Sequence, residues 1–389
     1  MSMPATKKPV LILFGGVSAE HEVSVITGLQ VVEAIDRENY IPYTIYVDKK
    51  GGLFYLQNLK DRGGFFTVPR KSVSFGRDAR GGYAQFAGAL GGLRTEKIYP
   101  YAAYLAFHGG KGESGPMQGL MESVEIPFTS PGQEASAVTM NKELTRRVAE
   151  AAGIPVAPGM SVFAAEIKKD AAGVAAAIIN NLSLPVIIKP AHLGSSIGLN
   201  IARTDIELQK FLLEATFIDN EILVEKYLSL AAEYNCAVRA INGVIETSEI
   251  ERPVSKDEIL SFADKYQRGA KKTGGSASGM ASLNRELPAK IDESLRREIQ
   301  DLAKRIFVAC ACKGMIRIDF MLTTDHKLYL TEPNPIPGSM AFYLWEASGI
   351  PFKQQISDMI EQAVRDEAQA ATMHLDYETD IIEKFTGRK

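Results

Sequence analysis

The chain opens with a strand, a helix and a second strand, and this order constrains its fold more than any other feature. The apolar run PVLILFGG, residues 9–16, ends in glycines and leads into the helical stretch EHEVSVITGLQVVEAIDR. A second apolar run, YIPYTIYVD at residues 40–48, follows this helix. A β-α-β opening favours a parallel sheet covered by helices. We therefore predict an α/β domain at the N-terminus.

The second half of the chain has a different strand pattern. EILVEKYL at residues 221–228 and EYNCAVRAINGVIETSEIERP at residues 233–253 predict successive strands of one antiparallel sheet. GMIRIDFMLTTDHKLYLTE at residues 314–332 predicts a hairpin. Residues 254–285 are rich in Gly, Ser, Lys and Ala without a strong period, which is typical of a functional or disordered loop. We therefore predict an α+β second half after the α/β first domain.

Length and composition narrow the class of protein further. The chain has 389 residues, which favours two or three domains, and its formal net charge of −3 argues against a nucleic-acid-binding surface. No apolar run is long enough to span a bilayer, and the N-terminus lacks the pattern of a signal peptide. The cysteines, Cys236, Cys310 and Cys312, do not make a disulfide framework. We expect no nucleic-acid or membrane partner, and a reducing, cytoplasmic location.

The hairpin carries the first candidate site. Because alternate side chains of a strand share a face, Arg317 and Asp319 lie on the same side of the first strand. Glu332 and Asn334 share a face of the return strand, and in the expected register Asp319 meets Glu332. Two adjacent carboxylates repel each other unless a cation lies between them, and oxygen ligands suit Mg²⁺. Taken alone, the hairpin favours another interpretation, a polar strand face on which Arg317 neutralises both acids.

A glycine-rich loop shifts the balance toward a metal and phosphate site. In LPVIIKPAHLGSSIGL a buried strand ends near Lys189, and the loop from Gly194 to Gly198 follows. Backbone N–H groups of such a loop can surround phosphate oxygens, and a lysine adds positive charge. The pattern is not a P-loop, and most isolated Gly-Ser loops are only turns. Together with the hairpin, however, the loop indicates a phosphate-binding site.

Two further strand ends carry polar residues. His108 ends the strand AAYLAFHGG, and more glycines follow it in HGGKGESGPMQG. In FGGVSAEHEVS, Glu20 and Glu22 stand where the first helix begins. The carboxyl edge of a parallel sheet is where α/β folds bind ligands. Helix capping alone would explain both acids, so the local pattern does not assign Glu20 a ligand role.

Taken together, these motifs resemble those of the D-alanine–D-alanine ligases of the ATP-grasp superfamily. The resemblance extends over nearly the whole chain, and it rests on the number, order and spacing of motifs that are not specific one by one. The motifs are GGVSAEHEVS, HGGKGESGPMQG, MNK at 140–142, KPAHLGSSIG, EKYL, KY at 265–266, RIDFML and EPNPIPG.

The resemblance implies a three-domain organisation. A Rossmann-like N-terminal domain would cover residues 1–141, and two ATP-grasp subdomains would cover residues 142–229 and 230–389. Residues 254–285 would form a mobile lid over the site. Family members are commonly homodimers through the first domain, so the resemblance also implies a dimer.

The resemblance also implies a reaction. The carboxylate of one D-alanine attacks the γ-phosphate of ATP to give an acylphosphate, and the amine of a second D-alanine then displaces phosphate through a tetrahedral intermediate. The product, D-alanyl-D-alanine, is a precursor of cell-wall peptidoglycan. The implied cofactors are ATP and two Mg²⁺ ions, with Mn²⁺ as a substitute, because phosphoryl transfer depends mainly on charge neutralisation.

Residue roles are implied where the motifs match. The residues assigned to ATP are Lys142, Lys189, Glu225, Lys226, Leu228, Glu233 and Lys265. The metal ligands are Asp319, Glu332 and Asn334. The catalytic residues are Glu20, Ser195, Tyr266, Arg317 and Gly338. The substrate-binding residues are Glu20, His108, Ser339 and Tyr343.

Within the catalytic set, the resemblance gives each group a task. Arg317 and the backbone N–H of Gly338 would donate to the oxyanion of the tetrahedral intermediate. Glu20 would anchor the ammonium group of the first substrate. Ser195 and Tyr266 would hydrogen-bond with Glu20 and hold the lid shut, which would exclude water from the acylphosphate.

The residues for the second substrate depart from the family pattern. The family usually has a serine for the acceptor's carboxylate five residues after the glycine of its EPNPIPG-type motif, and this position is Tyr343 here. Ser114 stands where the family usually has an acid. A second hypothesis therefore keeps the chemistry but uses D-serine, D-lactate or another amino acid as acceptor, although Tyr266 favours a peptide product. A nucleotide-binding regulator without activity is disfavoured, because Arg317 and the metal ligands are all present.

Overall fold

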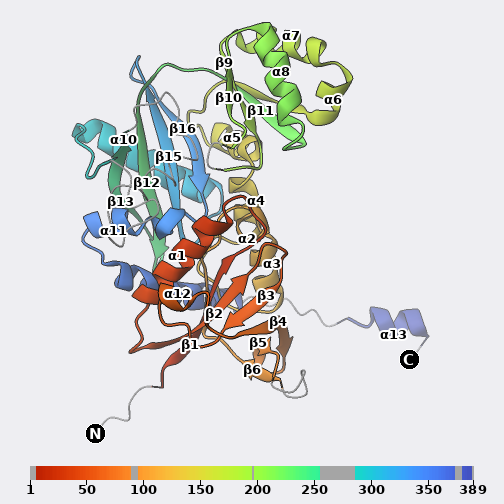
Figure 1. The fold of residues 1–389 in the computed structure, drawn as a ribbon, viewed down its shortest axis with the longest axis vertical. Helices are drawn as coiled ribbons and strands as arrows, with labels where there is room; N and C mark the ends of the chain where they lie inside the picture. The colour runs from red at the N-terminus through yellow and green to blue at the C-terminus, as the bar shows by residue number, and fades with distance from the viewer. Residues whose placement is uncertain (1–5, 89–94, 195–196, 255–284, 373–378, 388–389) are drawn as a thin grey trace.

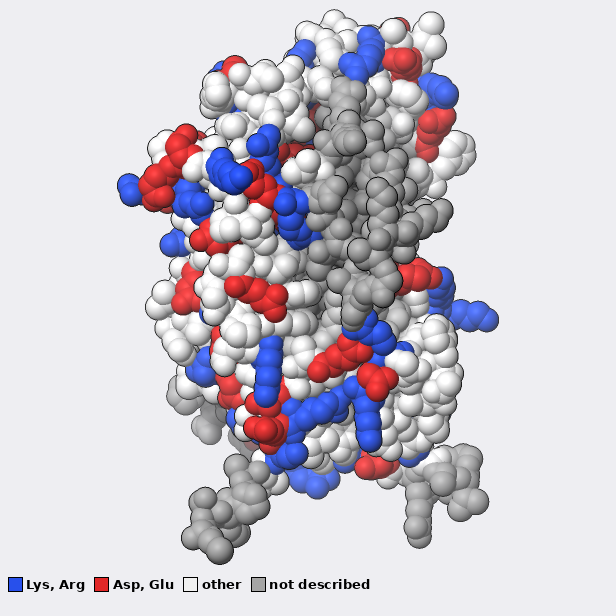
Figure 2. All heavy atoms as spheres, turned by 60° about the vertical axis from the view of Figure 1, so that its left-hand side comes forward, with Lys and Arg blue, Asp and Glu red and all other residues white. Residues whose placement is uncertain are grey.

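The computed structural model describes residues 6–88, 95–194, 197–254, 285–372 and 379–387. These residues form three sheets with covering helices (Figure 1). The predicted lid, residues 254–285, lies almost wholly outside the described part of the chain. No helix among the described residues is both long enough and apolar enough to cross a membrane. On the face shown in Figure 2, acidic and basic side chains are interspersed rather than gathered by sign.

The N-terminal sheet has seven strands in the order β6-β5-β4-β3-β2-β1-β7. Its strands are β1 (Lys8–Gly15), β2 (Tyr40–Val47), β3 (Leu53–Leu56), β4 (Arg70–Asp78), β5 (Gly81–Phe86), β6 (Glu96–Ile98) and β7 (Ala102–Leu105). β1 pairs in parallel with β2 and β7, as the β-α-β opening predicts, and the other pairs are antiparallel. The sequence suggests no function for residues 50–95, and the strands described within this range, β3, β4 and β5, extend the sheet on one side.

Helix α1 (His21–Ala34) connects β1 to β2 and packs closely on the sheet. Its buried positions include Val23, Thr27 and Val31, which are four residues apart and so share one face. A Cβ built on Gly28 would lie 2.1 Å from the Phe14 ring, so the absence of a side chain there lets α1 approach β1. The remaining helices of this region are η1 (Arg62–Gly64), α2 (Gly110–Glu113), α3 (Pro116–Ser123) and α4 (Gln133–Thr139).

A small antiparallel sheet of four strands follows, in the order β10-β9-β11-β8. Its strands are β8 (Gly159–Phe163), β9 (Val186–Pro190), β10 (Asn200–Ala202) and β11 (Glu221–Lys226). Helix α5 (Lys142–Ala151) precedes it, and α6 (Ala164–Lys169), α7 (Ala171–Leu182) and α8 (Asp205–Ala215) pack against it. Buried aliphatic side chains from these helices and strands form one core, so this sheet is a separate packing unit.

The large antiparallel sheet has five strands in the order β14-β13-β12-β15-β16. Its strands are β12 (Leu230–Ile241), β13 (Val244–Pro253), β14 (Arg285–Glu286), β15 (Met315–Thr323) and β16 (Leu328–Asn334). Its helices, and those that end the described chain, are α10 (Glu293–Ala309), η4 (Gly338–Ala341), α11 (Phe342–Ala347), α12 (Phe352–Ala370) and α13 (Ile381–Thr386). The predicted hairpin is confirmed as β15 paired with β16.

One prediction about the strands is wrong. EILVEKYL and the following segment do not belong to one sheet, because β11 pairs with β8 and β9, whereas β12 and β13 lie in the large sheet. The chain changes sheets over a few residues. The N–H of Tyr227 still donates to the carbonyl of Pro185, whereas the carbonyl of Ser229 already accepts from Thr324. Both segments have strand character, and only these long-range hydrogen bonds separate them.

Helix α12 packs beside the N-terminal sheet and α1 (Figure 1). Trp345 and Ile356, from α11 and α12, belong to the same core as Phe14 and Val31. The turn between β16 and α11 is thereby brought against α1, with which η4 makes direct contact. The predicted boundaries at residues 141 and 229 remain predictions, but this packing means that the last stretch of chain shares a core with the first domain.

Candidate active site

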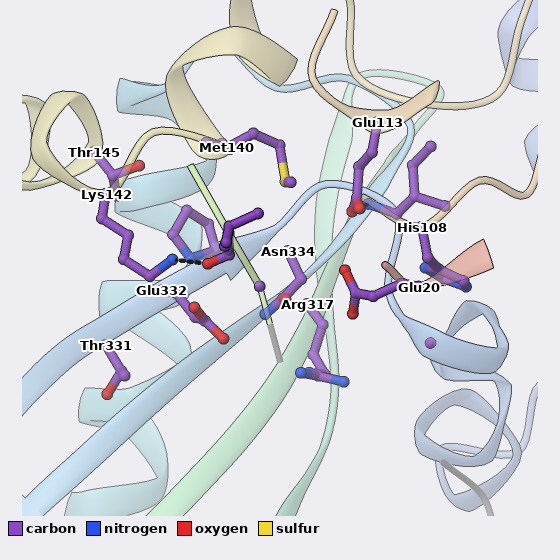
Figure 3. A pocket seen from close by; sticks show the side chains of 16 residues that line it. Glu20, His108, Glu113, Met140, Lys142, Thr145, Arg317, Thr331, Glu332 and Asn334 are labelled. Atoms are coloured by element: carbon purple, nitrogen blue, oxygen red, sulfur yellow. Dashed lines mark hydrogen bonds between the residues drawn. The ribbon is translucent and has the colours of Figure 1, made fainter. Parts of the chain in front are cut away.

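A polar cleft lies where the N-terminal sheet, the hairpin of the large sheet and the loop after β9 come together (Figure 3). It holds about 710 Å³ of empty space, part of it open to solvent. It is lined by Glu20, His108, Glu113, Thr139, Met140, Lys142, Thr145, Leu193, Gly194, Arg317, Thr331, Glu332, Pro333, Asn334, Ile336 and Gly338.

The structure brings many of the predicted site residues to this cleft. Those in its lining are Glu20, His108, Lys142, Arg317, Glu332, Asn334 and Gly338. The predicted residues that the structure describes outside the lining are Lys189, Glu225, Lys226, Leu228, Glu233, Asp319, Ser339 and Tyr343. Three predicted residues, Ser195, Lys265 and Tyr266, lie outside the described part of the chain.

The hairpin has the predicted register. Asp319 is directly opposite Glu332, and Arg317 is opposite Asn334. The Arg317 guanidinium forms two hydrogen bonds of 2.7 Å with the Asp319 carboxylate, and the Asn334 amide donates to the same carboxylate at 3.2 Å. Arg317 therefore neutralises Asp319, as the polar-face interpretation expects. Glu332 faces the cleft and contributes a second carboxylate.

Two lysines, Lys142 and Lys189, supply positive charge that interacts with Glu332 of the hairpin. Asn141 caps α5 by accepting from the N–H of Leu144 at 2.9 Å, which places Lys142 in the first turn of that helix. The Lys142 ammonium donates to the carbonyl of Leu193 in the glycine-rich loop (Figure 3). Burial lowers the pKa of Lys142, and the charge of Glu332 opposes this shift.

Lys189 is held differently. Its ammonium forms an ion pair with Glu225 across the pairing of β9 and β11, and both side chains are 11% exposed. Burial alone would lower the pKa of Lys189, but the adjacent Glu225 carboxylate, together with the charges of Glu332 and Glu233, outweighs burial and raises it. Lys189 is therefore a buried lysine that keeps its charge.

Glycines make room for Glu20 at the start of α1. A Cβ on Gly109 would lie 2.9 Å from a Glu20 carboxylate oxygen, and a Cβ on Gly194 would lie 3.1 Å from the same oxygen. Gly109 follows β7, whereas Gly194 belongs to the loop after β9. Glu20 is therefore the point at which the N-terminal sheet and the glycine-rich loop meet, which a reading of the helix start alone could not show.

Two buried groups of the N-terminal region are neutral near pH 7. Burial lowers the pKa of His108 to about 4. Burial, with a smaller contribution from the negative charge of Glu20, raises the pKa of Glu113 to about 8. The Glu113 carboxyl accepts from the N–H of Gly109 at 2.6 Å and from the N–H of Ile336 at 3.0 Å. It therefore links the loop after β7 to the turn after β16.

Glu113 is the main residue that the sequence analysis did not assign. Its signal was present, since it is a carboxyl five residues after His108 in the same glycine-rich run. The other lining residues were given no individual role, although Met140, Leu193, Gly194, Pro333 and Ile336 stand within the quoted motifs. The full set of these residues is Thr139, Met140, Thr145, Leu193, Gly194, Thr331, Pro333 and Ile336.

The turn after β16 has an unusual backbone. Ser339, Met340 and Ala341 have φ angles of 51°, 53° and 46°, in the left-handed region. For residues with a side chain this conformation costs about 1–2 kcal/mol each, so the surroundings must hold it. All three residues are nearly inaccessible to solvent. The Ser339 N–H donates to the hydroxyl of Thr27 at 3.1 Å, away from the cleft.

Tyr343 lies at the start of α11 and is 8% exposed. The guanidinium of Arg285 stacks 3.9 Å from the centroid of its ring. Within the described residues, the Tyr343 hydroxyl has no hydrogen-bond partner. Burial raises the pKa of this phenol, so it stays protonated and can act as a donor.

The chain has an N-terminal α/β sheet followed by two antiparallel sheets, which enclose a cleft with lysines and carboxylates. This arrangement is an ATP-grasp architecture. Family models narrow the class, since those described as D-ala D-ala ligase N-terminus and D-ala D-ala ligase C-terminus match residues 9–131 and 148–361. The chain belongs to the D-alanine–D-alanine ligase family and is an enzyme of the ligase class.

Named relatives agree with this assignment. A D-alanine–D-alanine ligase of Thermosipho africanus is 33% identical over 364 residues, covering 90% of this chain and 92% of that protein. One from Thermosipho melanesiensis is 32% identical over 383 residues, covering 97% and 99%.

Solved structures share the fold. The D-alanine-D-alanine ligase from Coxiella burnetii has a TM-score of 0.78 at 24% identity, covering 99% of this chain and 100% of that one. VanG D-Ala:D-Ser ligase from Enterococcus faecalis has a TM-score of 0.76 at 23% identity, covering 92% and 100%.

Proposed function

We propose that this enzyme joins two D-alanines to D-alanyl-D-alanine, with conversion of ATP to ADP and phosphate, for peptidoglycan synthesis. One observation carries the proposal. A single cleft collects Glu20 from the first domain, Lys142 from the start of α5, and Glu332 and Arg317 from the hairpin. These are the residues to which the ligase motifs give the tasks of substrate, phosphate, metal and oxyanion binding.

In the first step, a carboxylate oxygen of the first D-alanine attacks the γ-phosphorus of ATP, and ADP leaves. Glu20 holds the ammonium group of this substrate, since it is the acid at the first-domain side of the cleft. Lys142 and Lys189 offset the negative charge of the phosphates. Lys226, Leu228 and Glu233, with Glu225, bind the adenosine part of ATP, and Lys265 reaches its γ-phosphate.

The residues of the hairpin fit a divalent metal. Asp319, Glu332 and Asn334 offer two carboxylates and one amide oxygen on neighbouring positions of paired strands, and hard cations such as Mg²⁺ prefer oxygen ligands. Within the described parts of the chain, no group of three or more His, Cys, Asp or Glu side chains could hold a metal ion without other ligands. Two Mg²⁺ ions, replaceable by Mn²⁺, would supply charge neutralisation at the transferred phosphate.

In the second step, the amine of the second D-alanine attacks the carbonyl carbon of the acylphosphate, and phosphate leaves. Arg317 and the Gly338 N–H donate to the oxyanion that forms on the carbonyl oxygen. Its ion pair with Asp319 keeps the Arg317 guanidinium at the cleft wall. His108 lies beside the first substrate, and Ser195 and Tyr266 hold a lid closed over the acylphosphate.

The acceptor is the part of the proposal with a specific alternative. Tyr343 stands where the family commonly has a serine, and VanG, which shares this fold, is named a D-Ala:D-Ser ligase. Tyr343 and Ser339 are both candidate donors to an acceptor carboxylate, and the Tyr343 hydroxyl has no hydrogen-bond partner within the described residues. D-Serine, D-lactate or another amino acid is therefore the second candidate acceptor.

Phosphate release from ATP and Mg²⁺ tests both candidates. The purified chain is assayed with single D- and L-amino acids, then with pairs, and products are identified by mass. Release with D-alanine alone, together with a dialanine product, supports the first candidate. Release that requires D-serine or D-lactate beside D-alanine supports the second, and no release with any pair contradicts the proposed function.

We further propose the division into domains 1–141, 142–229 and 230–389, a homodimer formed through the first domain, and a cytoplasmic location. The shared core of the N-terminal sheet and α12 predicts that a fragment ending at residue 141 is less stable than the intact chain. Light scattering on the purified protein measures the oligomeric state. A mass of one chain at micromolar concentration would contradict the dimer.

A further inference from the structure

Thr27 connects three parts of the molecule and has no role in the ligase motifs. It lies in α1, is 1% exposed, and is not part of the cleft lining. The Ser339 N–H donates to its hydroxyl oxygen at 3.1 Å, and Nε2 of His108 lies 2.8 Å from the same oxygen. One hydroxyl of the first domain therefore contacts both the turn after β16 and an imidazole of the cleft.

The protonation of His108 sets the direction of these hydrogen bonds. Because burial keeps the ring neutral near pH 7, it has one N–H and one acceptor nitrogen. Nε2 therefore either accepts from the Thr27 hydroxyl or donates to its oxygen, and in both tautomers the Thr27 oxygen accepts from the N–H of Ser339.

The turn needs such anchors because of its backbone. A run of three left-handed residues with side chains persists only when surrounding contacts over-determine it. One anchor is Thr27, and another is Gln355 of α12, whose amide donates to the carbonyl of Met340 at 2.8 Å. A third contact, between Glu113 and the N–H of Ile336, holds the beginning of the turn. Gly338, which lines the cleft, stands between these anchors.

We propose that Thr27 is a positioning residue, whose hydroxyl fixes the turn from Gly338 to Ala341 and the His108 ring in one geometry, and so aims the Gly338 N–H into the cleft. The inference rests on the proposed function, in which this N–H stabilises the oxyanion. Thr27 acts through Ser339 and His108, and the anchoring therefore makes the first domain part of the oxyanion site.

Three variants test the kinetic consequence. Thr27→Val removes both hydrogen bonds at nearly constant volume, and Thr27→Ser keeps the hydroxyl. Thr44→Val is the matched control, since Thr44 is also 1% exposed and its hydroxyl has no hydrogen-bond partner within the described residues. We expect kcat of Thr27→Val to fall on the order of 100-fold, because small displacements of donors cost that much. KM for ATP should stay within about twofold, because ground-state binding is not altered.

The controls separate positioning from stability. Thr27→Ser should recover most of kcat, and Thr44→Val should match the wild type. An unchanged kcat in Thr27→Val overturns the proposal. A loss that Thr27→Ser does not recover also overturns it, because the hydroxyl would then not be the group that matters.

A second measurement does not depend on activity. ¹⁵N NMR spectra of histidine-labelled protein report which nitrogen of His108 carries the proton. We expect the Nε2 resonance to be the same in the wild type and in Thr27→Ser, and to shift in Thr27→Val, which lacks the hydroxyl that contacts Nε2. An unchanged resonance overturns the proposal. If the wild type forms no peptide, the proposed function fails, and the NMR comparison still decides whether Thr27 holds His108.

Discussion

The two sides of the cleft hold buried ionisable groups in opposite ways. On the side of the antiparallel sheets charges are paired, as in Lys189 with Glu225. On the side of the N-terminal sheet, burial raises the pKa of Glu113 to about 8 and lowers that of His108 to about 4, so both are neutral near pH 7. The paired side keeps full charges next to the place proposed for phosphates. Glu113 and His108 hold backbone groups of a turn without adding charge to the cleft, whereas Glu20 on the same side supplies the negative charge proposed for the substrate's ammonium group.

The difference follows from what each side must do. Phosphoryl transfer needs fixed positive charge, and a buried lysine keeps its charge only beside a carboxylate. Backbone N–H and carbonyl groups can be held by neutral acceptors and donors, which need no counter-ion. The Glu113 carboxyl accepts from the N–H of Ile336, and a hydrogen bond with the backbone of Ile336 opposes the lowering of the His108 pKa. The comparison therefore separates groups that act by charge from groups that act by position.

The largest expected effect is at the carboxylate that the hairpin presents to the cleft. Glu332→Gln keeps the shape of the side chain and removes its charge, so a loss of metal binding should lower kcat on the order of 10³-fold or more with the fold intact. Steady-state phosphate release measures the loss, and circular dichroism checks the fold. Glu134→Gln, an exposed acid on α4, is the matched control. Activity of Glu332→Gln close to that of the wild type would mean that the hairpin acids are only a polar strand face.

The next effect concerns the paired side. Lys189→Met or Glu225→Gln leaves one buried partner unpaired, which typically costs about 3–5 kcal/mol of unfolding free energy. The double variant should be more stable than either single variant, because no uncompensated charge remains. Activity should stay low in the double variant, since the lysine is still missing. Urea denaturation and phosphate release measure the two quantities, and additive losses of stability would show that the two residues are not coupled.

For the neutral groups Glu113 and His108 the expected effect depends on pH. The folded protein holds the Glu113 proton more tightly than an unfolded chain, in which the carboxyl titrates near 4.5. A rise in pH from about 4.5 to about 8 therefore destabilises the fold. His108 has the opposite effect, because burial lowers its pKa from 6.5 to about 4, so a rise in pH through this range stabilises the fold. Above about pH 6.5 this contribution to stability is complete. Between about pH 6.5 and 8 the free energy of unfolding should therefore fall by about 1–2 kcal/mol.

Glu113→Gln tests the origin of this slope. The amide does not titrate, so the decrease between pH 6.5 and 8 should disappear, even though the variant loses one acceptor and is less stable overall. Chemical denaturation at constant ionic strength across this interval measures both quantities. A slope equal to that of the wild type would mean that Glu113 is ionised in the folded protein, and that the two sides of the cleft do not differ as described.

The same comparison shows which parts could be predicted from the sequence. The β-α-β opening, the hairpin and the pairing of Asp319 with Glu332 depend on side-chain alternation and on glycines, which are local properties. Lys189, Asp319 and Glu332 stand in strand-end patterns that could be interpreted locally before the fold was known. Lys142 and Glu20 were assigned roles only through the resemblance of the whole set of motifs to the ligase family.

The contacts that the sequence did not reveal join distant segments. Thr27 and Ser339 are 312 residues apart, and Lys189 and Glu225 are 36 residues apart. The assignment of EILVEKYL to the wrong sheet has the same cause, because only its pairing with β8 and β9 decides the sheet. Glu113 was visible as a residue, but its neutral state depends on burial by the turn after β16. A local pattern can indicate a candidate site residue, whereas the contact partner of that residue and its protonation state depend on the fold.

Tyr343 belongs neither to the paired charges nor to the neutral groups that hold the turn, and its substitution gives the smallest expected effect on stability. Its hydroxyl is buried without a hydrogen-bond partner in the described structure, so Tyr343→Phe should leave the unfolding free energy unchanged or raise it by up to about 1 kcal/mol. If the hydroxyl receives the acceptor's carboxylate, the same change should raise KM for the acceptor about tenfold, the equivalent of one hydrogen bond, and leave KM for ATP unchanged. Initial rates against acceptor concentration measure this difference. An unaltered acceptor KM would instead mean that Tyr343 only supports Arg285, whose guanidinium stacks on its ring, and that the acceptor is held by other groups.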